Sequence, residues 1–353
     1  MTDQTKGLLD QVNAARAANR TLNIVGGGSK SFMGREQSAD STISVASHTG
    51  IVSYEPVELV LTARAGTRLV DIEAALSEQG QAMAFEPPHF SDKASLGGTL
   101  ACNQSGPARP WQGSVRDAVL GVRLINGYGE HLRFGGQVMK NVAGYDVSRA
   151  QAGAFGTLGI ITEISMKVLP KPKTTLTLVQ ELDAPAAIQR MNELSGRSQL
   201  LAGACWIDGL LYLRLMGSDS VVTATAKEWG GDVLDDEMVF WHSIKEQEHS
   251  FFSGAESLWR FSIKPNATHW RQDARWLIDW GGAQRWLRGD FDFATLETEA
   301  SNAKGQVGLF RGSQRKDEVF ATPSPGVKLL HQRLKKAFDP QGIFNPGRLY
   351  SWM

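Results

Sequence analysis

The chain has 353 residues, which exceeds the size of a typical single hydrophobic core, so two domains are expected. Its 37 basic and 37 acidic residues give a formal net charge of +0, which favours neither nucleic acid nor an acidic membrane surface as a partner. The polar N-terminus lacks the apolar core of a secretory signal, and no segment has the apolar length of a membrane span. Two distant cysteines, Cys102 and Cys205, fit a cytoplasmic location. They exclude a disulfide framework and an iron–sulfur cluster held by this chain alone.

Helices and strands mix through residues 20–170 without the regular rhythm of a doubly wound sheet. Apolar residues at helical spacing predict helices over residues 3–19 and after Thr67 to about Gln79. Apolar or alternating runs predict strands over residues 21–25, 57–63 and 164–168. Residues 119–134 are expected to form a hairpin in which Asn126-Gly127 is a two-residue turn.

The first strand runs directly into the glycine-rich turn Gly26-Gly27-Gly28-Ser29-Lys30-Ser31. This turn departs from a P-loop because Ile24 and Ser29 stand where that motif needs glycines. It departs from a dinucleotide fingerprint because Ser31 replaces the third glycine. Its N–H groups and Lys30 suit a phosphate, but glycine is also the default residue of tight turns. Taken alone, the turn leaves phosphate binding and a purely structural role equally open.

Small residues and hydroxyl groups gather between Phe85 and Pro170, in clusters that turns separate. Glycine lets a backbone N–H approach an anion closely, and Ser and Thr add hydroxyl donors. A single glycine pair would indicate only a tight turn. Several glycine clusters with interleaved Ser, Thr and Asn favour a cradle for a phosphorylated cofactor instead.

Four motifs in this part of the chain resemble the FAD-binding fold shared by vanillyl-alcohol oxidase and para-cresol methylhydroxylase (PCMH). They cover residues 25–29, 94–106, 113–121 and 156–163. More narrowly, residues 139–146 and 339–348 resemble the E subunits of bacterial glycolate oxidases, and this resemblance extends over most of the chain.

The resemblance implies an α+β fold in three parts. A PCMH-type FAD-binding domain with two α/β subdomains would occupy residues 1–170, and a ferredoxin-like α+β cap would occupy residues 171–335. Residues 336–353 would return to the flavin domain.

The resemblance also implies which residues bind FAD. The first glycine turn and residues 95–99 would hold the pyrophosphate, residues 103–106 and 113–114 would lie along the flavin, and backbone groups of residues 159–161 would face the adenine or ribose. Some relatives attach FAD through a His near this first turn, but Ser29 and Lys30 stand there, so non-covalent FAD is expected. The implied cofactor-binding residues are Val25, Gly26, Gly27, Gly28, Ser29, Lys30, Pro87, Pro88, Ser95, Leu96, Gly97, Gly98, Thr99, Asn103, Ser105, Gly106, Gly113, Ser114, Gly159, Ile160, Ile161, Asn345 and Arg348.

The pattern changes after residues 170–173, which are expected to form a linker. Alternating strand and helix patterns then predict most of a ferredoxin-like unit. Its strands would cover residues 174–180, 200–207 and 210–216, and its helices residues 184–195 and 218–229.

Nine of the ten tryptophans lie in this second half, from Trp206 to Trp352. They would form an aromatic pocket, a partner interface or an ordinary core. Trp276, Trp280 and Trp286 stand beside charged residues, and we expect them to be half-exposed.

His242 and His249 stand seven residues apart, a spacing that would place them on one face of a helix over residues 240–252. Hydroxy-acid dehydrogenases of this flavin family often bind a divalent metal through His-x-x-Asp-Gly-Asn-x-His followed by Glu-His. The Asp-Gly-Asn core and a later Glu-His are missing here, so a solvated helix face is favoured and no metal is expected.

Oxidation of a 2-hydroxy acid needs a base for the hydroxyl proton and a cation for the carboxylate. No constellation singles out a residue from the candidates Arg260, Lys264, His269 and Arg271. Lys140 and Tyr145 lie in a motif expected near the flavin, and they are the predicted catalytic residues. Lys140 would stabilise a reduced anionic flavin or form a structural ion pair, and the sequence leaves both open.

The favoured function is an FAD-binding subunit of a glycolate oxidase complex, with a homologous flavoprotein subunit and an iron–sulfur subunit as partners. The missing metal motif suggests that the homologous subunit carries most of the oxidation of glycolate to glyoxylate. A cytoplasmic location is expected, with contact to the inner face of the membrane left to the partners. Two alternatives stay open: a self-sufficient FAD-dependent 2-hydroxy-acid dehydrogenase, and a structural subunit with a vestigial flavin site.

Overall fold

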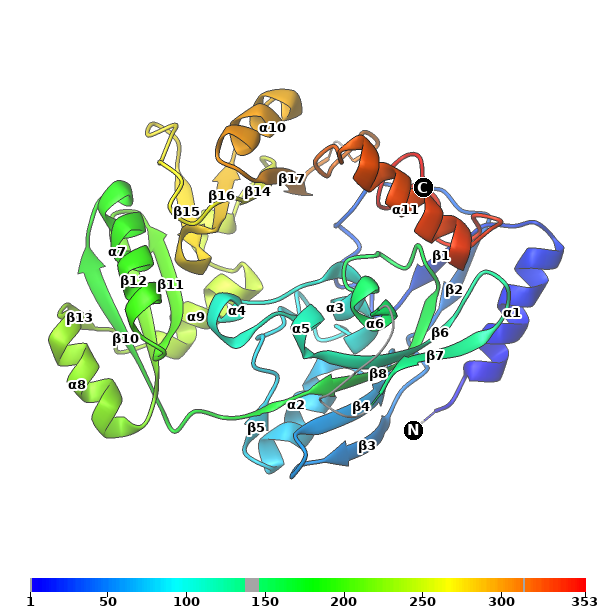
Figure 1. Cartoon of the computed structure of the whole chain (residues 1–353), viewed down its shortest axis with the longest axis horizontal. Coiled ribbons are helices and arrows are strands. Elements are labelled where there is room, and N and C mark those ends of the chain that lie inside the picture. The colour runs from blue at the N-terminus through cyan, green and yellow to red at the C-terminus, as the bar shows by residue number, and fades with distance from the viewer. Residues whose placement is uncertain (1, 137–145, 314) are drawn as a thin grey trace.

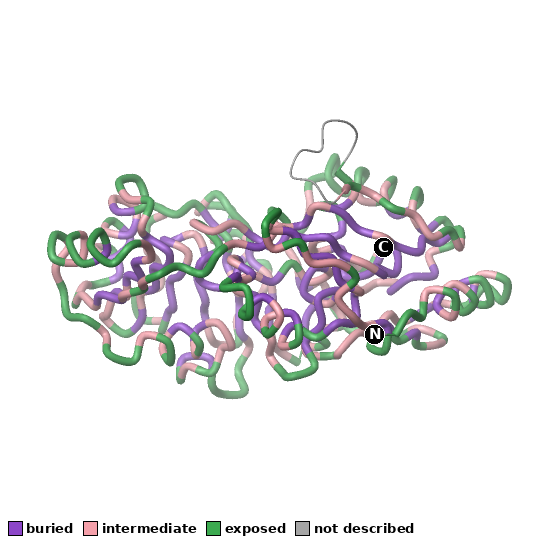
Figure 2. Tube along the Cα trace, turned by 90° about the horizontal axis from the view of Figure 1, so that it is seen from below, coloured by how far each residue is buried: buried purple, intermediate pink, exposed green. Residues whose placement is uncertain are grey.

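A computed structural model describes residues 2–136, 146–313 and 315–353. The predicted catalytic residues Lys140 and Tyr145 lie outside these ranges. Two sheets dominate the molecule, one in each half of the chain (Figure 1). Figure 2 shows buried segments in both halves of the elongated molecule, with the two termini in the same half.

The N-terminal half is built on a five-stranded antiparallel sheet in the order β3-β4-β8-β6-β7. Leu69, Ile72 and Leu76 of α2 pack with Leu96 and Leu100 of α3 in the core beside this sheet. The elements up to the linker are α1 (Thr5–Ala17), β1 (Leu22–Val25), β2 (Ser41–Ser44), β3 (Ile51–Glu55), β4 (Val60–Arg64), α2 (Leu69–Glu78), β5 (Gln81–Ala82), α3 (Leu96–Cys102), α4 (Arg109–Gln112), α5 (Val115–Ala118), β6 (Val119–Ile125), β7 (His131–Gly135), α6 (Val147–Ala150), β8 (Ile160–Lys167) and β9 (Leu169–Pro170).

A smaller layer carries the first glycine-rich turn. The predicted helix over residues 3–19 is α1, whose Leu8 and Val12 pack against the parallel pair β1-β2. The C-terminal segment joins the same layer, because Phe344 bridges to Leu22 of β1. The chain therefore returns to the N-terminal half after the second sheet.

Two local predictions in this half were wrong. Residues 57–59 belong to the turn between β3 and β4, where Val57 is 93% exposed, so the strand begins only at Val60. The hairpin β6-β7 exists, but Ile125 pairs with His131, so its loop holds five residues instead of two. The Asn126 side chain stabilises this longer loop, because its Oδ1 accepts hydrogen bonds from the N–H groups of Tyr128 and Glu130.

The second half forms an eight-stranded sheet in the order β13-β10-β12-β11-β15-β16-β14-β17. The predicted ferredoxin-like unit is confirmed from β10 to β13, and four further strands extend its sheet. The elements are β10 (Thr174–Glu181), α7 (Ala184–Arg197), β11 (Leu201–Ile207), β12 (Leu210–Gly217), α8 (Asp219–Trp229), β13 (Asp232–Val233), α9 (Glu237–Glu246), η1 (Ser250–Phe252), β14 (Leu258–Ser262), β15 (Trp276–Asp279), η2 (Trp280–Gly282), β16 (Gln284–Arg288), α10 (Phe293–Asn302) and β17 (Gln306–Arg311). The helix α11 (Pro325–Phe338) follows and spans the boundary predicted after residue 335.

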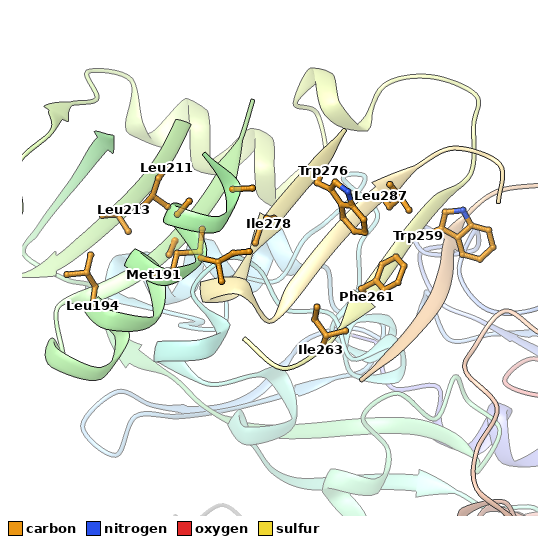
Figure 3. Packing of buried hydrophobic residues seen from close by; sticks show 14 of the residues in the cluster. Met191, Leu194, Leu211, Leu213, Trp259, Phe261, Ile263, Trp276, Ile278 and Leu287 are labelled. Atoms are coloured by element: carbon orange, nitrogen blue, oxygen red, sulfur yellow. The ribbon is translucent and has the colours of Figure 1, made fainter. Parts of the chain in front are cut away.

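One face of this sheet carries a large apolar core that includes Trp259, Phe261 and Trp276 (Figure 3). Trp276 is 2% exposed there, and Trp286 is 5% exposed in the core on the opposite face. The prediction that both are half-exposed was wrong, because both faces of the sheet are covered here, and the neighbouring charged residues Asp279 and Arg285 are themselves buried. Trp280 is half-buried, and its Nε1–H donates to the carbonyl of Gly106.

The two halves are joined by directed polar contacts. Glu246 at the end of α9 accepts the backbone N–H groups of His89 and Phe90, the latter at 2.8 Å. Arg214 of β12 pairs with Glu86 at 2.8 Å. These contacts hold the cap sheet against the loop that follows β5.

Candidate functional site

A cleft lies between the first glycine-rich turn, α3 and the C-terminal segment. Thirteen of the predicted cofactor-binding residues line it: Val25, Gly26, Gly27, Gly28, Ser29, Lys30, Ser95, Gly97, Gly98, Gly159, Ile161, Asn345 and Arg348. Segments that are far apart in the sequence therefore meet at one site.

The turn after β1 presents a row of unused donors. No described residue accepts a hydrogen bond from the backbone N–H groups of Gly27, Gly28, Ser29 or Lys30. Gly28 has φ 76°, and a Cβ at Gly27 would lie 1.5 Å from the carbonyl oxygen of Lys93, so the turn needs glycine at both positions. Successive free N–H groups of this kind form a concave anion site.

The first turn of α3 faces this row. Ser95 caps the helix by accepting the N–H of Gly98, and its Oγ would lie 2.8 Å from a Cβ at Gly26. A Cβ at Gly98 would meet only that Oγ, at 3.3 Å, and otherwise open space in the cleft. The two loops thus approach each other closely, and their glycines leave room between them for a ligand.

Lys30 supplies a buried positive charge at the edge of the cleft. Its side chain is 6% exposed, and its Nζ donates to Ser29 Oγ and to the carbonyl of His89 and lies over the ring of Phe90. Burial lowers its pKa to about 8. Both hydrogen-bond partners that Lys30 Nζ has in the part of the chain that the structure describes are neutral, so the site has a cation ready for an anionic ligand.

The C-terminal segment closes the other side of the cleft. Asn345 Oδ1 accepts the N–H of Ile24 at 2.7 Å, and its Nδ2 donates to the carbonyl of Phe155 at 2.6 Å. Arg348 donates to the carbonyls of Ser31 and Arg35. Asn345 was predicted to bind cofactor, but both ends of its amide hold the cleft walls together.

A buried ion pair fixes this segment. Lys335 Nζ donates to Asp339 Oδ2 at 2.7 Å and to the carbonyls of Thr157 and Phe344. Asp339 in turn accepts the N–H groups of Ile343 and Phe344. Because every group of this network has a partner, it locks α11 to the loop beside Gly159.

The remaining predicted cofactor-binding residues lie elsewhere. Pro88, Ser105 and Gly106 line a smaller cavity below the cap, and Asn103 lines a neighbouring one. Ser114 caps α5 in a capping box with Asp117, after Gly113 at φ 85°. Pro87, Leu96, Thr99 and Ile160 are buried.

Several cleft residues were not predicted from the sequence, among them Asn23, Ile24, Gln37, Val45, Ala65, Ala101, Cys102, Phe155 and Gly156. Gln37 is the most informative, because its Nε2 donates to Asn23 Oδ1 while its buried Oε1 has no partner among the described residues. An orphan acceptor and a row of orphan N–H groups in one cleft fit a ligand with an amino-bearing base and phosphates. The residues present therefore fit a dinucleotide such as FAD.

The described residues contain no group of three or more His, Cys, Asp or Glu side chains that could hold a metal. The helix α9 ends at Glu246, and Gln247 is left-handed, so His242 and His249 do not share a helix. His242 is exposed on α9, as a solvated face predicts, whereas His249 caps η1 by accepting the N–H of Phe251.

Comparison with known proteins decides the family. Residues 3–135 match the family profile of an FAD binding domain. The chain is 45% identical over 349 residues to the glycolate oxidase subunit GlcE of Escherichia coli (strain K12), covering 99% of this chain and 98% of that protein. The chain belongs to the GlcE family.

Other similarities of this GlcE-family chain are partial. The glycolate oxidase subunit GlcD of Bacillus subtilis (strain 168) is 36% identical over 141 residues, which are 38% of this chain and 29% of that protein. A solved alkyldihydroxyacetonephosphate synthase superposes with a TM-score of 0.67 over 97% of this chain and 74% of its own, at 16% identity, which shows the fold alone. The predicted PCMH-type α+β fold and FAD cofactor are confirmed. None of the described helices is long and apolar enough to cross a membrane.

Proposed function

We propose that this chain is the FAD-binding E-type subunit of a glycolate oxidase, and that its cleft holds FAD without a covalent bond. The row of free N–H groups from Gly27 to Lys30, opposite Gly98, carries this proposal. In this proposal the free N–H groups and Lys30 hold the pyrophosphate of FAD, and Gln37 Oε1 accepts a hydrogen bond from the adenine amino group. No His stands in this turn to attach the flavin.

Bound FAD supplies a two-electron acceptor for the oxidation of glycolate to glyoxylate, the reaction of an oxidoreductase acting on the CH–OH of a 2-hydroxy acid. The residues of this chain would position the flavin ring and shield it from water. Pro88, Ser105 and Gly106, with Asn103, border the space below the cap where the flavin ring would lie. Small residues there permit close contact with a flat ring.

We further propose that the chain works in a complex with a homologous flavoprotein subunit and an iron–sulfur subunit. Cys102 and Cys205 are too few to hold a cluster, so electrons would leave through a partner. A cytoplasmic complex, associated with the inner face of the membrane through those partners, is part of the same proposal. The division into residues 1–170, 171–335 and 336–353, and the catalytic roles of Lys140 and Tyr145, also remain proposals.

The test is FAD occupancy of the purified chain and of Gly98→Leu. Wild type is expected to be yellow and to release all its flavin on denaturation. In Gly98→Leu the new side chain would extend into the cleft and reduce occupancy at least tenfold. The control Gly196→Leu, on the exposed surface of α7 with open space around it, leaves occupancy unchanged. Full occupancy in Gly98→Leu, or a colourless wild type, would overturn the assignment.

A further inference from the structure

A carboxylate from the second half of the chain reaches the loop beside Lys30. Glu246 is the last residue of α9, and its side chain is 8% exposed. It accepts hydrogen bonds from the backbone N–H groups of His89 at 3.0 Å and Phe90 at 2.8 Å, which lie in the loop after β5. Successive N–H groups in such a turn form an anion site, and here the anion comes from the other half of the molecule.

The peptide group between His89 and Phe90 contacts a charged side chain at each end. Its carbonyl oxygen accepts a hydrogen bond from Lys30 Nζ at 3.4 Å, and its N–H donates to Glu246 Oε2. The C=O and N–H of a trans peptide group lie in one plane and point in opposite directions, so a single orientation of the plane serves both contacts. The negative charge of Glu246 therefore favours the orientation that turns the carbonyl oxygen toward Lys30.

The Phe90 side chain adds a second link to Lys30. Lys30 Nζ lies 5.5 Å from the centre of the Phe90 ring. Phe90 has φ 57°, a left-handed conformation that bulky residues rarely adopt. Its ring packs edge-on against Phe32 and Phe310, at centroid distances of 5.4 and 6.3 Å. Glu246 thus holds a residue in an uncommon conformation that places its ring next to the Lys30 cation.

Glu246 stands at an unfavourable place in its own helix. A negative charge in the last turn opposes the helix dipole, and a buried carboxylate costs free energy unless it is paired and hydrogen-bonded. Lys245 Nζ lies 3.2 Å from Glu246 Oε1. The favourable contacts of this carboxylate are therefore those with Lys245 and with the two N–H groups of the loop.

We propose that Glu246 is a positioning residue for FAD binding, which holds Lys30 Nζ at the cleft through the His89–Phe90 peptide group. Glu246 is not among the residues that line the cleft, so it acts only through this loop. FAD affinity then depends on a contact between the two halves of the chain. The inference rests on the proposed function, because it requires that Lys30 contacts the pyrophosphate.

The test is a titration of the FAD-free chain with FAD, followed by flavin fluorescence. Glu246→Gln keeps the shape of the side chain, removes its charge, and is expected to weaken FAD binding about fivefold, as for groups in one hydrogen-bond network. The matched control is Glu237→Gln in the first turn of α9, whose carboxylate accepts hydrogen bonds from Thr175 and Thr177 of the same half. This control leaves the FAD affinity unchanged, and circular dichroism shows that both variants are folded.

A double-variant cycle separates positioning from a general loss of structure. Lys30→Met alone is expected to weaken FAD binding strongly. In the Lys30→Met background, Glu246→Gln is expected to have no further effect on FAD affinity, because the side chain that it positions is gone. A merely structural role of Glu246 would weaken FAD binding by the same factor in both backgrounds.

The pH dependence of FAD affinity gives a second measurement. Burial lowers the pKa of Lys30 to about 8, and the Cys102 and Glu246 side chains, which face it within the described residues, oppose this shift. FAD affinity is expected to fall as pH rises through this pKa, because the cation is lost. Glu246→Gln removes one of the opposing groups, so the fall is expected at a lower pH than in wild type.

The outcomes separate this inference from the proposed function. If Lys30→Met binds FAD as tightly as wild type, the pyrophosphate role of Lys30 is wrong and the inference fails with it. If Lys30→Met binds weakly but Glu246→Gln binds like wild type, only the positioning role is wrong. An equal loss on Glu246→Gln in both backgrounds also overturns the positioning role and leaves the FAD site intact.

Discussion

The cleft beside the glycine-rich turn and the cavity below the cap differ in the chemical groups that line them. The cleft uses backbone N–H groups from one contiguous turn, Gly27 to Lys30, and glycines that leave space. The cavity uses the polar side chains Arg260, Asp279 and Gln284 from three strands, β14, β15 and β16, that pack side by side. A site made of backbone N–H groups can be predicted from a short sequence motif. A group of side chains from three strands can be predicted only when the register of strand pairing is known.

Each site contains a buried ionisable group whose pKa is shifted because burial removes it from water. Lys30 in the cleft and Asp279 in the cavity both have pKa values moved toward neutrality by burial. Each group therefore destabilises the ligand-free fold at neutral pH, and a bound pyrophosphate would relieve this cost at Lys30. Such groups concentrate at functional sites.

The largest effect expected from this comparison is at Asp279. Its pKa is raised from 3.8 to about 7, so the folded chain holds a proton that the unfolded chain loses between these values, and stability falls as pH rises through that window. Asp279→Asn removes this penalty and is expected to raise the free energy of unfolding by up to about 4 kcal/mol above pH 7, with no gain below pH 4. Denaturation with urea from pH 4 to 8 measures the difference. A gain that is independent of pH would contradict the shift.

A slightly smaller effect of the opposite pH dependence is expected at Lys30. Its pKa is lowered from 10.5 to about 8, so the penalty is complete below pH 8 and disappears as pH rises toward 10.5. Lys30→Met is expected to stabilise the FAD-free chain by up to about 3 kcal/mol at pH 7 and to weaken FAD binding at least tenfold. Thermal unfolding of FAD-free chain and titration with FAD measure the two effects. Unchanged FAD affinity would separate Lys30 from the pyrophosphate.

The smallest of these effects is expected at Asn345, which joins the walls of the cleft. Asn345→Ala leaves the Ile24 N–H and the Phe155 carbonyl without partners and is expected to cost about 2 kcal/mol of stability. FAD binding would weaken indirectly, and added FAD would raise the melting temperature of the variant as it does for wild type. If Asn345 contacted FAD directly, stability would change little and FAD affinity would fall most.

Many residues of the cofactor cleft could be predicted from the sequence, because they lie in short glycine-rich motifs. Gly26 to Lys30 follow a strand and meet Ser95 to Gly98, and thirteen predicted residues share one cleft. Gln37 escaped prediction because no motif surrounds it, and its role follows only from a buried oxygen that tertiary packing leaves without a partner. Asn345 was placed correctly at the cleft, but its two hydrogen bonds depend on segments more than a hundred residues away.

The sequence alone determined the family, the order of elements from β10 to α8 and the glycine turns, because hydrophobic period and turn chemistry act over a few residues. Only the tertiary structure decided which strands became neighbours. That pairing buried Trp276 and Trp286 on opposite faces, widened the loop after Asn126 and brought Arg260 and Asp279 to one cavity. The physical reason is that a side chain's face in a sheet follows from pairing register, which contacts distant in sequence select.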